Sequence, residues 1–547
     1  MYSSVDTIWV LLGAVLVFFM QAGFAMVETG FTRAKNAGNI IMKNLMDFAL
    51  GTIVFWVLGF GLMFGASNYG IIGTLDLFVQ GDYSSTIPTY AFLIFQTVFC
   101  ATAATIVSGA MAERTKFSSY LIYSAAISAV IYPISGHWIW GGGWLSQLGF
   151  HDFAGSTAVH MVGGVAAFVG AKIVGARIGK YDEDGKPKAI LGHSVTLGAL
   201  GVFILWFAWF GFNAGSTLSA TGDDALLAMS TIFVTTNIAA AVSATTTMAL
   251  TWFLYKKPDV SMTLNGALAG LVAITAGCDA VSPIGALFIG LIAAFVVVFG
   301  IEFIDKTLKI DDPVGAIGVH GFCGAAGTIL VGLFSLQEGL FYGHGAHLLG
   351  VQLTGVIAVI AWVAISMTIL FTIIKSTVGL RVSREEEVTG LDIEEHGLES
   401  SYADFMPTTV ISSIPVSEAI PVKIDNYDES SDKQVREVVV VMNKNKFESF
   451  KASMEKIGIS GMTVVSAYGC GMQKGNAEYY RGVKLEMQLI PKVKVEIVIA
   501  EIPLDLVIKT AKQSLYTGNI GDGKIFVYNV DKVIKIRTGE EDFDAIK

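Results

Sequence analysis

The chain has 547 residues, of which 53% are hydrophobic and only 15% are charged, against roughly 25% charged residues in an ordinary soluble domain. This balance excludes a single soluble globule, and the 60 glycines are typical of membrane helices that pack closely. A net charge of −10 argues against nucleic-acid binding, and four scattered cysteines without a CxxC pair indicate neither a zinc site nor a disulfide scaffold.

Apolar runs long enough to be candidate membrane spans occupy residues 1–380. Eleven of them lie near 7–29, 44–66, 89–111, 118–134, 153–175, 190–211, 225–254, 262–277, 284–301, 314–334 and 347–374. No basic segment precedes the first run, so we interpret it as a retained span rather than a cleaved signal peptide. Residues 1–380 are therefore predicted to form a polytopic α-helical membrane domain with eleven transmembrane helices.

The basic residues predict the orientation of this domain. All 15 Lys and Arg residues of 1–380 lie in or beside the loops after spans 1, 3, 5, 7, 9 and 11, and the other loops contain none. Cytoplasmic loops carry the Lys and Arg excess, so the N-terminus is expected outside and the C-terminal domain in the cytoplasm. The expected location is the cell (inner) membrane.

A repeated pattern, D-x-x-G-x-x-x-V-H, opens the fifth and tenth runs and ends at His160 and His320. The basic residues place Asp152 at the outer membrane face and Asp312 at the inner face, so the two copies run in opposite directions. Spans 1–5 and 6–10 therefore fit a 5+5 inverted repeat with a functional site near the midplane. Eight helical residues cover about 12 Å, so both histidines reach that depth and are expected to meet on the pseudo-two-fold axis.

Two other interpretations of His160 and His320 remain open. Each imidazole can simply hydrogen-bond across a helix interface, or the two can bind a metal ion. Ionisable groups inside a membrane are costly and usually face a pathway or a partner, which favours a paired function at equivalent repeat positions. Two imidazoles without a nearby carboxylate or thiolate pair are a poor metal-ligand set.

Several motifs in residues 1–380 closely resemble the ammonium transporter family (Amt/Mep/Rh). They are FAMVETGFTRAKN at 24–36, GAMAERTKF at 109–117, HWIWGGGWL at 137–145, DFAGSTAVH at 152–160, WFGFNAGS at 209–216 and DDPVGAIGVHGFCG at 311–324. This resemblance implies a homotrimer of eleven-helix subunits, each with its own narrow pore.

The same resemblance assigns roles to individual residues. Phe99, Trp140 and Ser216 are expected to line an outer recruitment site, with Asp152 beneath it organising the vestibule. Phe99 and Phe212 are expected to stack as a gate, and the two histidines to line the pore below. An ammonium ion binds an aromatic face with about 0.5–2 kcal/mol and donates a hydrogen bond to a serine hydroxyl, which agrees with these roles.

Selectivity is expected to follow from the apolar constriction. A dehydrated cation there costs several kcal/mol, and potassium has no way to avoid that cost. Ammonium can release a proton, after which ammonia passes the gate and exchanges hydrogen bonds with His160 and His320. The two imidazoles can also relay the proton.

The remaining residues are predicted to form a linker and a soluble domain. Residues 381–432 are acidic, contain Ser and Pro, show weak helical periodicity and are interpreted as linker. Residues 433–547 alternate strand and helix patterns in the order βαββαβ, which is ferredoxin-like.

GNIGDGKI at 518–525 nearly matches a nucleotide-binding P-loop, but Ile525 replaces the hydroxyl residue and a strand pattern follows, which argues against a P-loop NTPase. Taken alone, the glycines and Lys524 fit a phosphate cradle or a hairpin turn.

Residues 433–547 closely resemble PII nitrogen-signalling proteins through GMQKGNAEYYRG, IPKVKVEI, TGNIGDGKIFV and VIKIRTGE. That resemblance implies a trimer that binds ATP or ADP between subunits, and Gln473 is expected to help bind Mg with ATP and 2-oxoglutarate. The residues expected to contact nucleotide are Thr463, Gly471, Gln473, Lys492, Gly521, Asp522, Gly523, Lys524, Lys535 and Arg537.

Two positions depart from the PII pattern. Leu485 stands where many relatives have a tyrosine that is uridylylated, which puts that control in doubt despite the nearby Tyr479 and Tyr480. Lys535 stands where relatives often have arginine, which keeps the charge but loses the bidentate fork.

The predicted function is ammonium transport regulated by a fused PII domain. Arg481, in the loop 474–485, resembles the family's arginine that enters the cytoplasmic pore exit, and a solvated loop arginine is the simpler interpretation. The alternative function is an ammonium sensor with little net transport that signals through the PII domain. An enzyme is the weakest hypothesis because no pair of nucleophile and base is apparent. No tightly bound cofactor is expected in the membrane domain.

Overall fold

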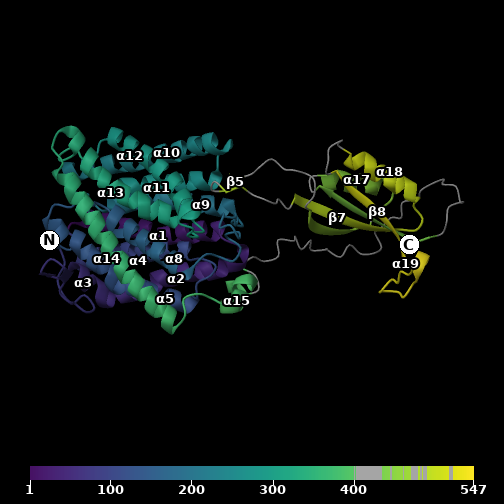
Figure 1. Cartoon of the computed structure of the whole chain (residues 1–547), viewed down its shortest axis with the longest axis horizontal. Helices are drawn as coiled ribbons and strands as arrows, with labels where there is room; N and C mark the ends of the chain where they lie inside the picture. The colour runs from purple at the N-terminus through teal and green to yellow at the C-terminus, as the bar shows by residue number, and fades with distance from the viewer. Residues whose placement is uncertain are drawn as a thin grey trace. The chain divides into compact units, whose positions relative to one another are not determined.

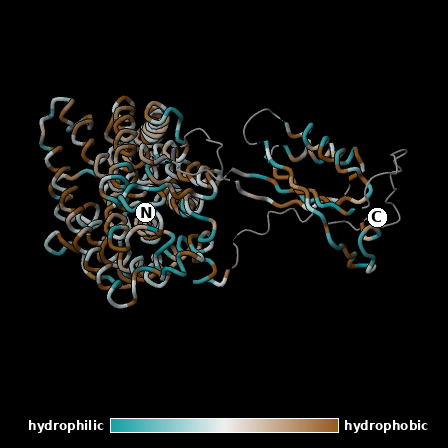
Figure 2. Tube along the Cα trace, turned by 45° about the vertical axis from the view of Figure 1, so that its right-hand side comes forward, coloured by the Kyte–Doolittle hydropathy of each residue, from teal (hydrophilic) through white to brown (hydrophobic). Residues whose placement is uncertain are grey.

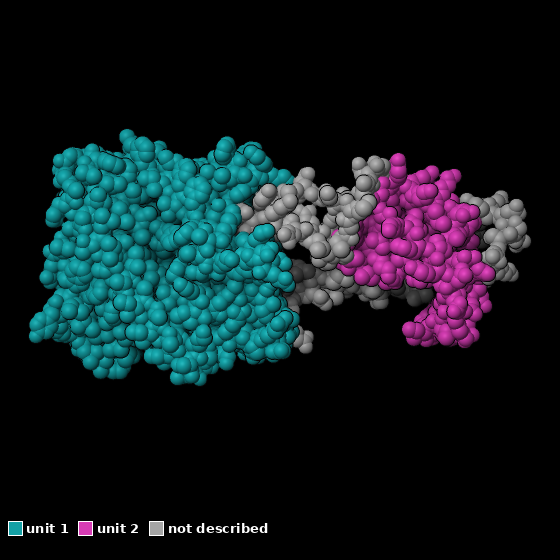
Figure 3. All heavy atoms as spheres, in the orientation of Figure 1, with its two compact units in different colours: residues 1–403, 479–484 teal, residues 404–478, 485–547 magenta. Residues whose placement is uncertain are grey.

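The computed structural model describes residues 1–398, 401, 434–443, 446–459, 461–469, 479–480, 483–484, 490–516 and 522–546. The chain divides into two compact units, one formed by Met1–Ala403 and Tyr479–Lys484 and the other by Asp404–Glu478 and Leu485–Lys547 (Figure 3). Each unit contains a hydrophobic core of its own. The two units are described separately below.

The first unit is a bundle of long apolar helices (Figure 1). Ten helical segments of the described residues are long and apolar enough to cross a membrane, some of them built from two consecutive helices. They contain α1 (Ser4–Phe31), α2 (Ala37–Val54) with α3 (Phe60–Phe64), α4 (Thr89–Ala110), α5 (Phe117–Ala126) with α6 (Tyr132–Ile139), α8 (Val162–Val174), α9 (Val195–Gly215), α10 (Asp223–Tyr255), α12 (Pro283–Glu302), α13 (Cys323–Phe334) and α14 (His347–Thr377).

The apolar run predicted near 262–277 falls on α11 (Val260–Ile274), which has 15 residues. It is shorter than the roughly 20 residues that cross a bilayer at right angles. The other ten predicted runs fall on the ten longer segments. Hydrophobic residues, brown in Figure 2, follow these helices, whereas hydrophilic residues are common in the turns between them.

Glycines allow α1 and α9 to pack closely. A Cβ atom on Gly30 would lie 2.4 Å from the backbone nitrogen of Gly198, and one on Gly201 would lie 2.6 Å from the carbonyl oxygen of Gly23. Such distances leave no room for a side chain, so backbone packs directly on backbone, as is common between membrane helices. These are the first and sixth helices of the predicted repeat.

The second unit contains a four-stranded antiparallel sheet with the strand order β4-β7-β3-β8. The strands are β3 (Arg436–Asn443), β4 (Thr463–Gly469), β7 (Ile490–Ile499) and β8 (Gly523–Asn529), and the helices α17 (Phe447–Lys456) and α18 (Leu504–Leu515) follow β3 and β7. Phe450, Met454 and Val507 from the helices pack on one sheet face, where Val438 and Val495 are also buried. In the described residues this is the βαββαβ order that the sequence predicts.

The first part of the predicted linker is folded. Residues 384–396 form α15 (Arg384–Thr389) and α16 (Leu391–His396). A capping box starts α15, because Ser383 accepts a hydrogen bond from the backbone of Glu386 while Glu386 accepts one from the backbone of Ser383. Each helix has only six residues, so helical periodicity was too short to detect, and local caps and contacts with the bundle hold them instead.

Candidate functional site

The first copy of the repeated motif folds as a capped helix start. The buried carboxylate of Asp152 accepts four backbone hydrogen bonds of 2.8–2.9 Å, from the N–H groups of residues 155–158. They begin the π-helical turn η4 (Ser156–Met161), which continues as α8. Gly155 turns the chain at a φ of +115°, a conformation that favours glycine. Trp140 donates its indole N–H to the carbonyl oxygen of Asp152 at 2.7 Å, so Asp152 also positions this aromatic ring.

The second copy uses the same cap. The carboxylate of Asp312 accepts hydrogen bonds from Gly315 and Ile317 at 2.9 and 2.8 Å, and Gly315 has a φ of +84°. The capped turn η6 (Ile317–Phe322) is also π-helical and continues as α13. Both histidines lie in these widened turns, a kind of local helix distortion that is frequent at functional sites.

The structure brings the two histidines into contact. Nδ1 of His160 and Nδ1 of His320 are 3.2 Å apart, and the two rings are stacked at 25° with centroids 5.2 Å apart. His160 is fully buried and His320 is 4% exposed. Gly164 permits this approach, because a Cβ atom there would lie 2.1 Å from the backbone nitrogen of Gly321, next to His320.

The predicted gate residues stack directly beside the histidine pair. The rings of Phe99 and Phe212 are 4.2 Å apart at 27°, and Phe212 lies 5.3 Å from the ring of His160. On its other side Phe99 meets Trp140 edge-on, with centroids 6.2 Å apart. Trp140, Phe99, Phe212 and the two histidines therefore form an unbroken series of ring contacts in space.

Ser216 caps the end of α9 in this region. Its hydroxyl donates to the carbonyl oxygen of Phe212 at 2.8 Å, which leaves the oxygen lone pairs to accept a hydrogen bond from a cation. Ser216 and Trp140 are partly exposed, in contrast to the buried Phe99 and Phe212. Two of the residues predicted to recruit the cation are therefore partly accessible, whereas the residues predicted to form the gate are buried.

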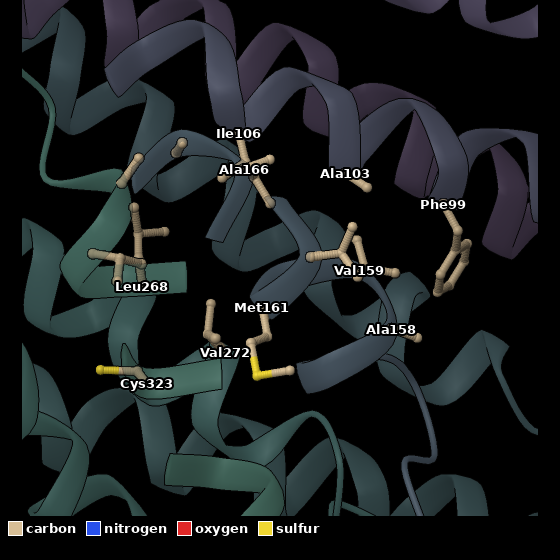
Figure 4. Packing of buried hydrophobic residues seen from close by; sticks show 14 of the residues in the cluster. Phe99, Ala103, Ile106, Ala158, Val159, Met161, Ala166, Leu268, Val272 and Cys323 are labelled. Carbon is tan, nitrogen blue, oxygen red and sulfur yellow. The ribbon is translucent and has the colours of Figure 1, made fainter. Parts of the chain in front are cut away.

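The walls around the histidine segment are apolar. Figure 4 shows Phe99, Ala103 and Ile106 along α4, with Val159 and Met161 on the neighbouring π-helical turn. All five are buried. These five side chains contribute no hydrogen-bonding group to the surroundings of the histidine pair.

Trp209 belongs to the same site but was missed from the sequence. Its indole stacks on His160 at 20° with centroids 4.9 Å apart, and its N–H donates to the hydroxyl of Thr275 at 2.9 Å. The signal available was its position one helical turn before Phe212 in the WFGFNAGS motif.

A buried ion cluster lies just before the second capped turn. Arg177 holds Asp311 through two hydrogen bonds of 2.8 and 2.9 Å and pairs with Glu113 at 3.1 Å. Burial alone raises the pKa of Asp311, but Arg177 and Arg114 outweigh it and hold that pKa well below its ordinary value. The stability that ionised Asp311 adds to the fold is therefore fully present above the ordinary carboxyl pKa. It is lost only when the pH falls through the lowered pKa of Asp311. Asp311 directly precedes Asp312, so this cluster fixes the cap of the segment that carries His320.

Residues 381–398, here named the C-terminal clamp, bind three helix ends of the membrane unit. Asp392 accepts backbone hydrogen bonds from Gly38 and Asn39 at 3.0 and 2.8 Å, where α2 begins. The backbone N–H of Phe117 at the start of α5 donates to both carboxylate oxygens of Glu395, and Glu387 accepts a hydrogen bond of 2.7 Å from the backbone N–H of Ile178, after α8. Acidic side chains satisfy the free N–H groups of a helix start and complement its dipole.

We expect Asp392→Ala to destabilise the membrane unit by about 0.5–2 kcal/mol, because it removes the cap of α2. The midpoint of thermal unfolding of the purified protein in detergent measures this. Glu394→Ala is the matched control, since Glu394 lies on the same helix, is exposed, and its carboxylate makes no hydrogen bond with any described residue. Equal midpoints for the two variants would contradict the capping role.

Three of the predicted nucleotide contacts share one sheet face in the second unit. The register pairs Thr463 with Glu496, Ala467 with Lys492, and Lys524 with Val441, and it places Thr463, Lys492 and Lys524 on the face that α17 and α18 leave uncovered. Lys492 donates a hydrogen bond to the side chain of Asn443.

The other predicted contacts are placed only in part. Asp522 immediately precedes β8, and Gly523 has a φ of +131°, where an added Cβ atom would lie 2.1 Å from the carbonyl oxygen of Val441. Lys535 pairs with Glu540 at 3.1 Å in the turn that contains the exposed Arg537. Gly471, Gln473, Gly521, Arg481 and Leu485 lie outside the described residues. No group of three or more His, Cys, Asp and Glu side chains in the described part of the chain could hold a metal ion.

The bundle of membrane-length apolar helices, with a buried histidine pair beside stacked aromatic rings, defines the class of protein: a polytopic helical membrane transporter. The family model described as "Ammonium Transporter Family" matches residues 8–402, and the model described as "Nitrogen regulatory protein P-II" matches residues 435–540. The chain therefore belongs to the ammonium transporter family and carries a C-terminal PII domain.

Individual relatives agree with this assignment. The chain is 50% identical to "Ammonium transporter Amt2" of Archaeoglobus fulgidus over 426 residues, which cover 74% of this chain and 89% of that protein. It is 43% identical to "Putative ammonium transporter sll1017" of a Synechocystis strain, covering 72% and 88%. Among solved structures, "Sensor Amt Protein" matches with a TM-score of 0.68 and 42% identity, covering 72% of this chain and 98% of that one. Candida albicans Mep2 matches with a TM-score of 0.65 and 28% identity, covering 70% and 88%.

Proposed function

We propose that this protein conducts ammonium through a pore in each subunit of a trimer, with deprotonation before the gate and passage of ammonia past His160 and His320. One observation carries the proposal. The two histidines occupy equivalent places in two identically capped turns and contact each other below the stacked Phe99 and Phe212. An apolar constriction followed by a paired hydrogen-bonding site suits a neutral molecule that can still donate and accept hydrogen bonds.

The chain's own residues account for each step. Trp140, Phe99 and the hydroxyl oxygen of Ser216 bind ammonium, and the phenylalanine pair excludes a hydrated cation. In a neutral histidine pair, one Nδ1 donates and the other accepts, so the accepting ring carries its proton on Nε2. Nε2 of His160 is buried and has no hydrogen-bond partner among the described residues. It is thus available to a passing ammonia molecule or to a proton in transfer.

The architecture proposed for this function has eleven spans with a 5+5 inverted repeat in residues 1–380, a linker at 381–432 and the PII domain at 433–547. The two matching aspartate caps and the close packing of α1 on α9 support the repeat. The distribution of basic residues supports an outer N-terminus and a cytoplasmic PII domain in the cell (inner) membrane.

A trimer is proposed for both domains. In the PII domain, the sheet face that the helices leave uncovered exposes Val465, Phe526 and Tyr528 by 41–51%. Apolar side chains gathered on one surface mark a contact with another chain. Subunits that meet there would enclose the face carrying Thr463, Lys492 and Lys524.

Uptake into proteoliposomes tests the transport function. An inward ammonium gradient should produce a current or ammonium accumulation that empty liposomes lack, with little response to potassium. A correctly folded protein in liposomes that moves neither ammonium nor ammonia would overturn the proposal. That result would instead favour an ammonium sensor that signals through its PII domain, a second candidate supported by the 42% identity to the structure described as "Sensor Amt Protein".

Nucleotide sensing is proposed for the PII domain, with ATP or ADP bound at the shared sheet face and 2-oxoglutarate bound with Mg and ATP near Gln473. Ligands that bind only the folded state stabilise it by mass action, by about 2.7 kcal/mol at 100 times Kd. We therefore expect either nucleotide to raise the unfolding temperature of the PII domain within the full chain. Lys524→Ala should weaken that protection, whereas Lys451→Ala, a change on the exposed side of α17, should not. No protection at millimolar nucleotide would contradict sensing.

Self-regulation is proposed through Arg481, which would enter the cytoplasmic pore exit. Because residues 381–398 are bound to the membrane unit, about 35 residues connect it to the PII domain. A chain of that length with random-coil statistics spans about 30–35 Å and gives an effective concentration around millimolar, so weak docking would be well populated. We expect ADP to favour docking and ATP with 2-oxoglutarate to release it. Coupling is reciprocal, so docking should also change nucleotide affinity.

Arg481→Ala and deletion of residues 433–547 should both raise transport measured under ADP. Unchanged transport in both, in a preparation whose unmodified protein binds ADP, would exclude the plug.

A further inference from the structure

A second polar group shares a cavity with the histidine pair. The cavity is lined by His320, Glu28 and Asn265 together with apolar residues that include Phe24 and Leu268. Neither Phe99 nor Phe212 contributes to it, so it lies away from the gate and begins where the histidines end. Under the proposed orientation, this is the cytoplasmic side of the pair.

Glu28 is a buried carboxyl group that forms no direct ion pair with a described basic side chain. Its side chain lies in α1 and only 3% of the residue is exposed. Ser108 and Asn44 donate hydrogen bonds of 2.9 and 3.2 Å to one oxygen, Oε2. The other oxygen, Oε1, accepts none from the residues that the structure describes, and no described Lys, Arg or His lies within 4.0 Å of the carboxyl group.

The buried Lys43 acts on Glu28 electrostatically but forms no ion pair with it. Lys43, which is 1% exposed, lies 5.5 Å from the centre of the Tyr120 ring, and Asp47 accepts a hydrogen bond of 2.6 Å from the Tyr120 hydroxyl. A buried carboxylate that no cation contacts directly is costly, and inside a membrane such a group usually serves a transported ion or proton. Asn265 adds a second acceptor, because its amide N–H donates to the carbonyl oxygen of Val314 at 3.2 Å and leaves the amide oxygen free for the cavity.

We propose that Glu28 is the group that accepts the proton from the histidine pair and returns it to ammonia, so that each transported ammonium carries its charge across. This inference rests on the transport function proposed above. Glu28 acts on the side of the pair opposite the gate, and Asn265 helps to hold the ammonium that forms there.

The proton balance closes without any further reactant. Ammonium loses a proton before the gate, and this proton is relayed to the His160–His320 pair, which becomes cationic, while ammonia passes the gate. The N–H bond of His320 then breaks and an O–H bond forms on Glu28, which leaves a neutral pair and a neutral carboxyl group. Ammonia entering the cavity takes this proton, so the O–H bond breaks and a fourth N–H bond forms. Ammonium leaves, and Glu28 is again a carboxylate.

The test compares charge and ammonia movement in proteoliposomes of the full chain that contain a pH-sensitive dye. For Glu28→Gln, which keeps the shape and an oxygen for Ser108 and Asn44, the ammonium-evoked current should fall by about 100-fold. Ammonia should still enter and make the lumen alkaline. Asp47→Asn is the matched control, because Asp47 is an equally buried carboxyl group that does not line the cavity, and its current should be unchanged.

The outcomes separate this inference from the transport function. A Glu28→Gln current equal to that of the unmodified protein overturns the role of Glu28. So does an unmodified protein that makes the lumen alkaline without any current, although transport itself then stands. If neither signal appears in the unmodified protein, the transport function fails first. Infrared difference spectra give a measurement that needs no variant to fold: ammonium should change a protonated-carboxyl band in the unmodified protein, and the absence of any such change overturns the proposal.

Discussion

Replacing either His160 or His320 with leucine should abolish ammonium transport or let potassium compete with ammonium. Leucine has a similar volume and no hydrogen-bonding group, so the path beyond Phe99 and Phe212 would offer ammonia no partner and the proton no carrier. Loss of one of the two imidazoles should lower the ammonium-evoked current by about 100-fold or more. Proteoliposome currents in ammonium and in potassium, recorded at equal protein content, measure both effects.

Size-exclusion chromatography provides the control for folding, since the leucine variants should elute as the unmodified protein does. Both sites are apolar on most sides, with Trp209 and Phe212 beside His160 and Phe24 beside His320, which should accommodate the aliphatic side chain. Unchanged ammonium flux with unchanged discrimination against potassium in both variants would show that the pair has no part in conduction.

Gly164→Ala should have an effect of comparable size at a residue that touches no substrate. The added methyl group would lie 2.1 Å from the backbone nitrogen of Gly321 and 2.7 Å from the carbonyl carbon of His320. Backbone atoms cannot rotate out of the way, so α8 and the turn that carries His320 must separate. We expect overpacking to cost about 1–3 kcal/mol of stability, and the displaced histidine to lower transport by about 100-fold.

Gly350→Ala is the matched control for this variant. Gly350 also lies within a membrane helix, but a Cβ atom there meets nothing within 4 Å. Alanine should leave transport unchanged and stabilise α14 by about 0.5–1 kcal/mol. A Gly164→Ala protein with normal transport would mean that the histidine contact is not needed at its observed distance.

The membrane class and the positions of the helices were predictable from the sequence, because a bilayer requires apolar runs of a set length. The linker at 381–432 was predicted less well. Its composition and weak helical periodicity suggested a linker, yet α15 and α16 form there because Asp392, Glu395 and Glu387 bind backbone N–H groups at the ends of other helices. Such contacts join residues more than 200 positions apart and leave no periodic pattern in the sequence.

For the motif around Asp152, too, the sequence predicted one part of the arrangement and the structure supplied the other. The sequence resemblance suggested a carboxylate that organises the vestibule, and the structure shows how a carboxylate can do so while all its hydrogen bonds go to the backbone. The repeat itself, with aspartate and glycine at fixed spacing, was visible because a helix cap is a local arrangement. Glu28 gave no such signal, since an acidic residue near the end of an apolar run also fits a membrane–water interface.

By itself, then, the sequence determined that this protein is a helical membrane transporter with two histidines at the same place in a repeated motif and a ferredoxin-like domain after them. Hydropathy and short motifs carry that information because both depend on neighbouring residues. Only the tertiary structure decided that the histidines are 3.2 Å apart, that Trp209 stacks on one of them, and that Glu28 shares a cavity with the other. Those facts depend on how closely helices distant in the chain can approach, which is set by glycines such as Gly164 packing against another backbone.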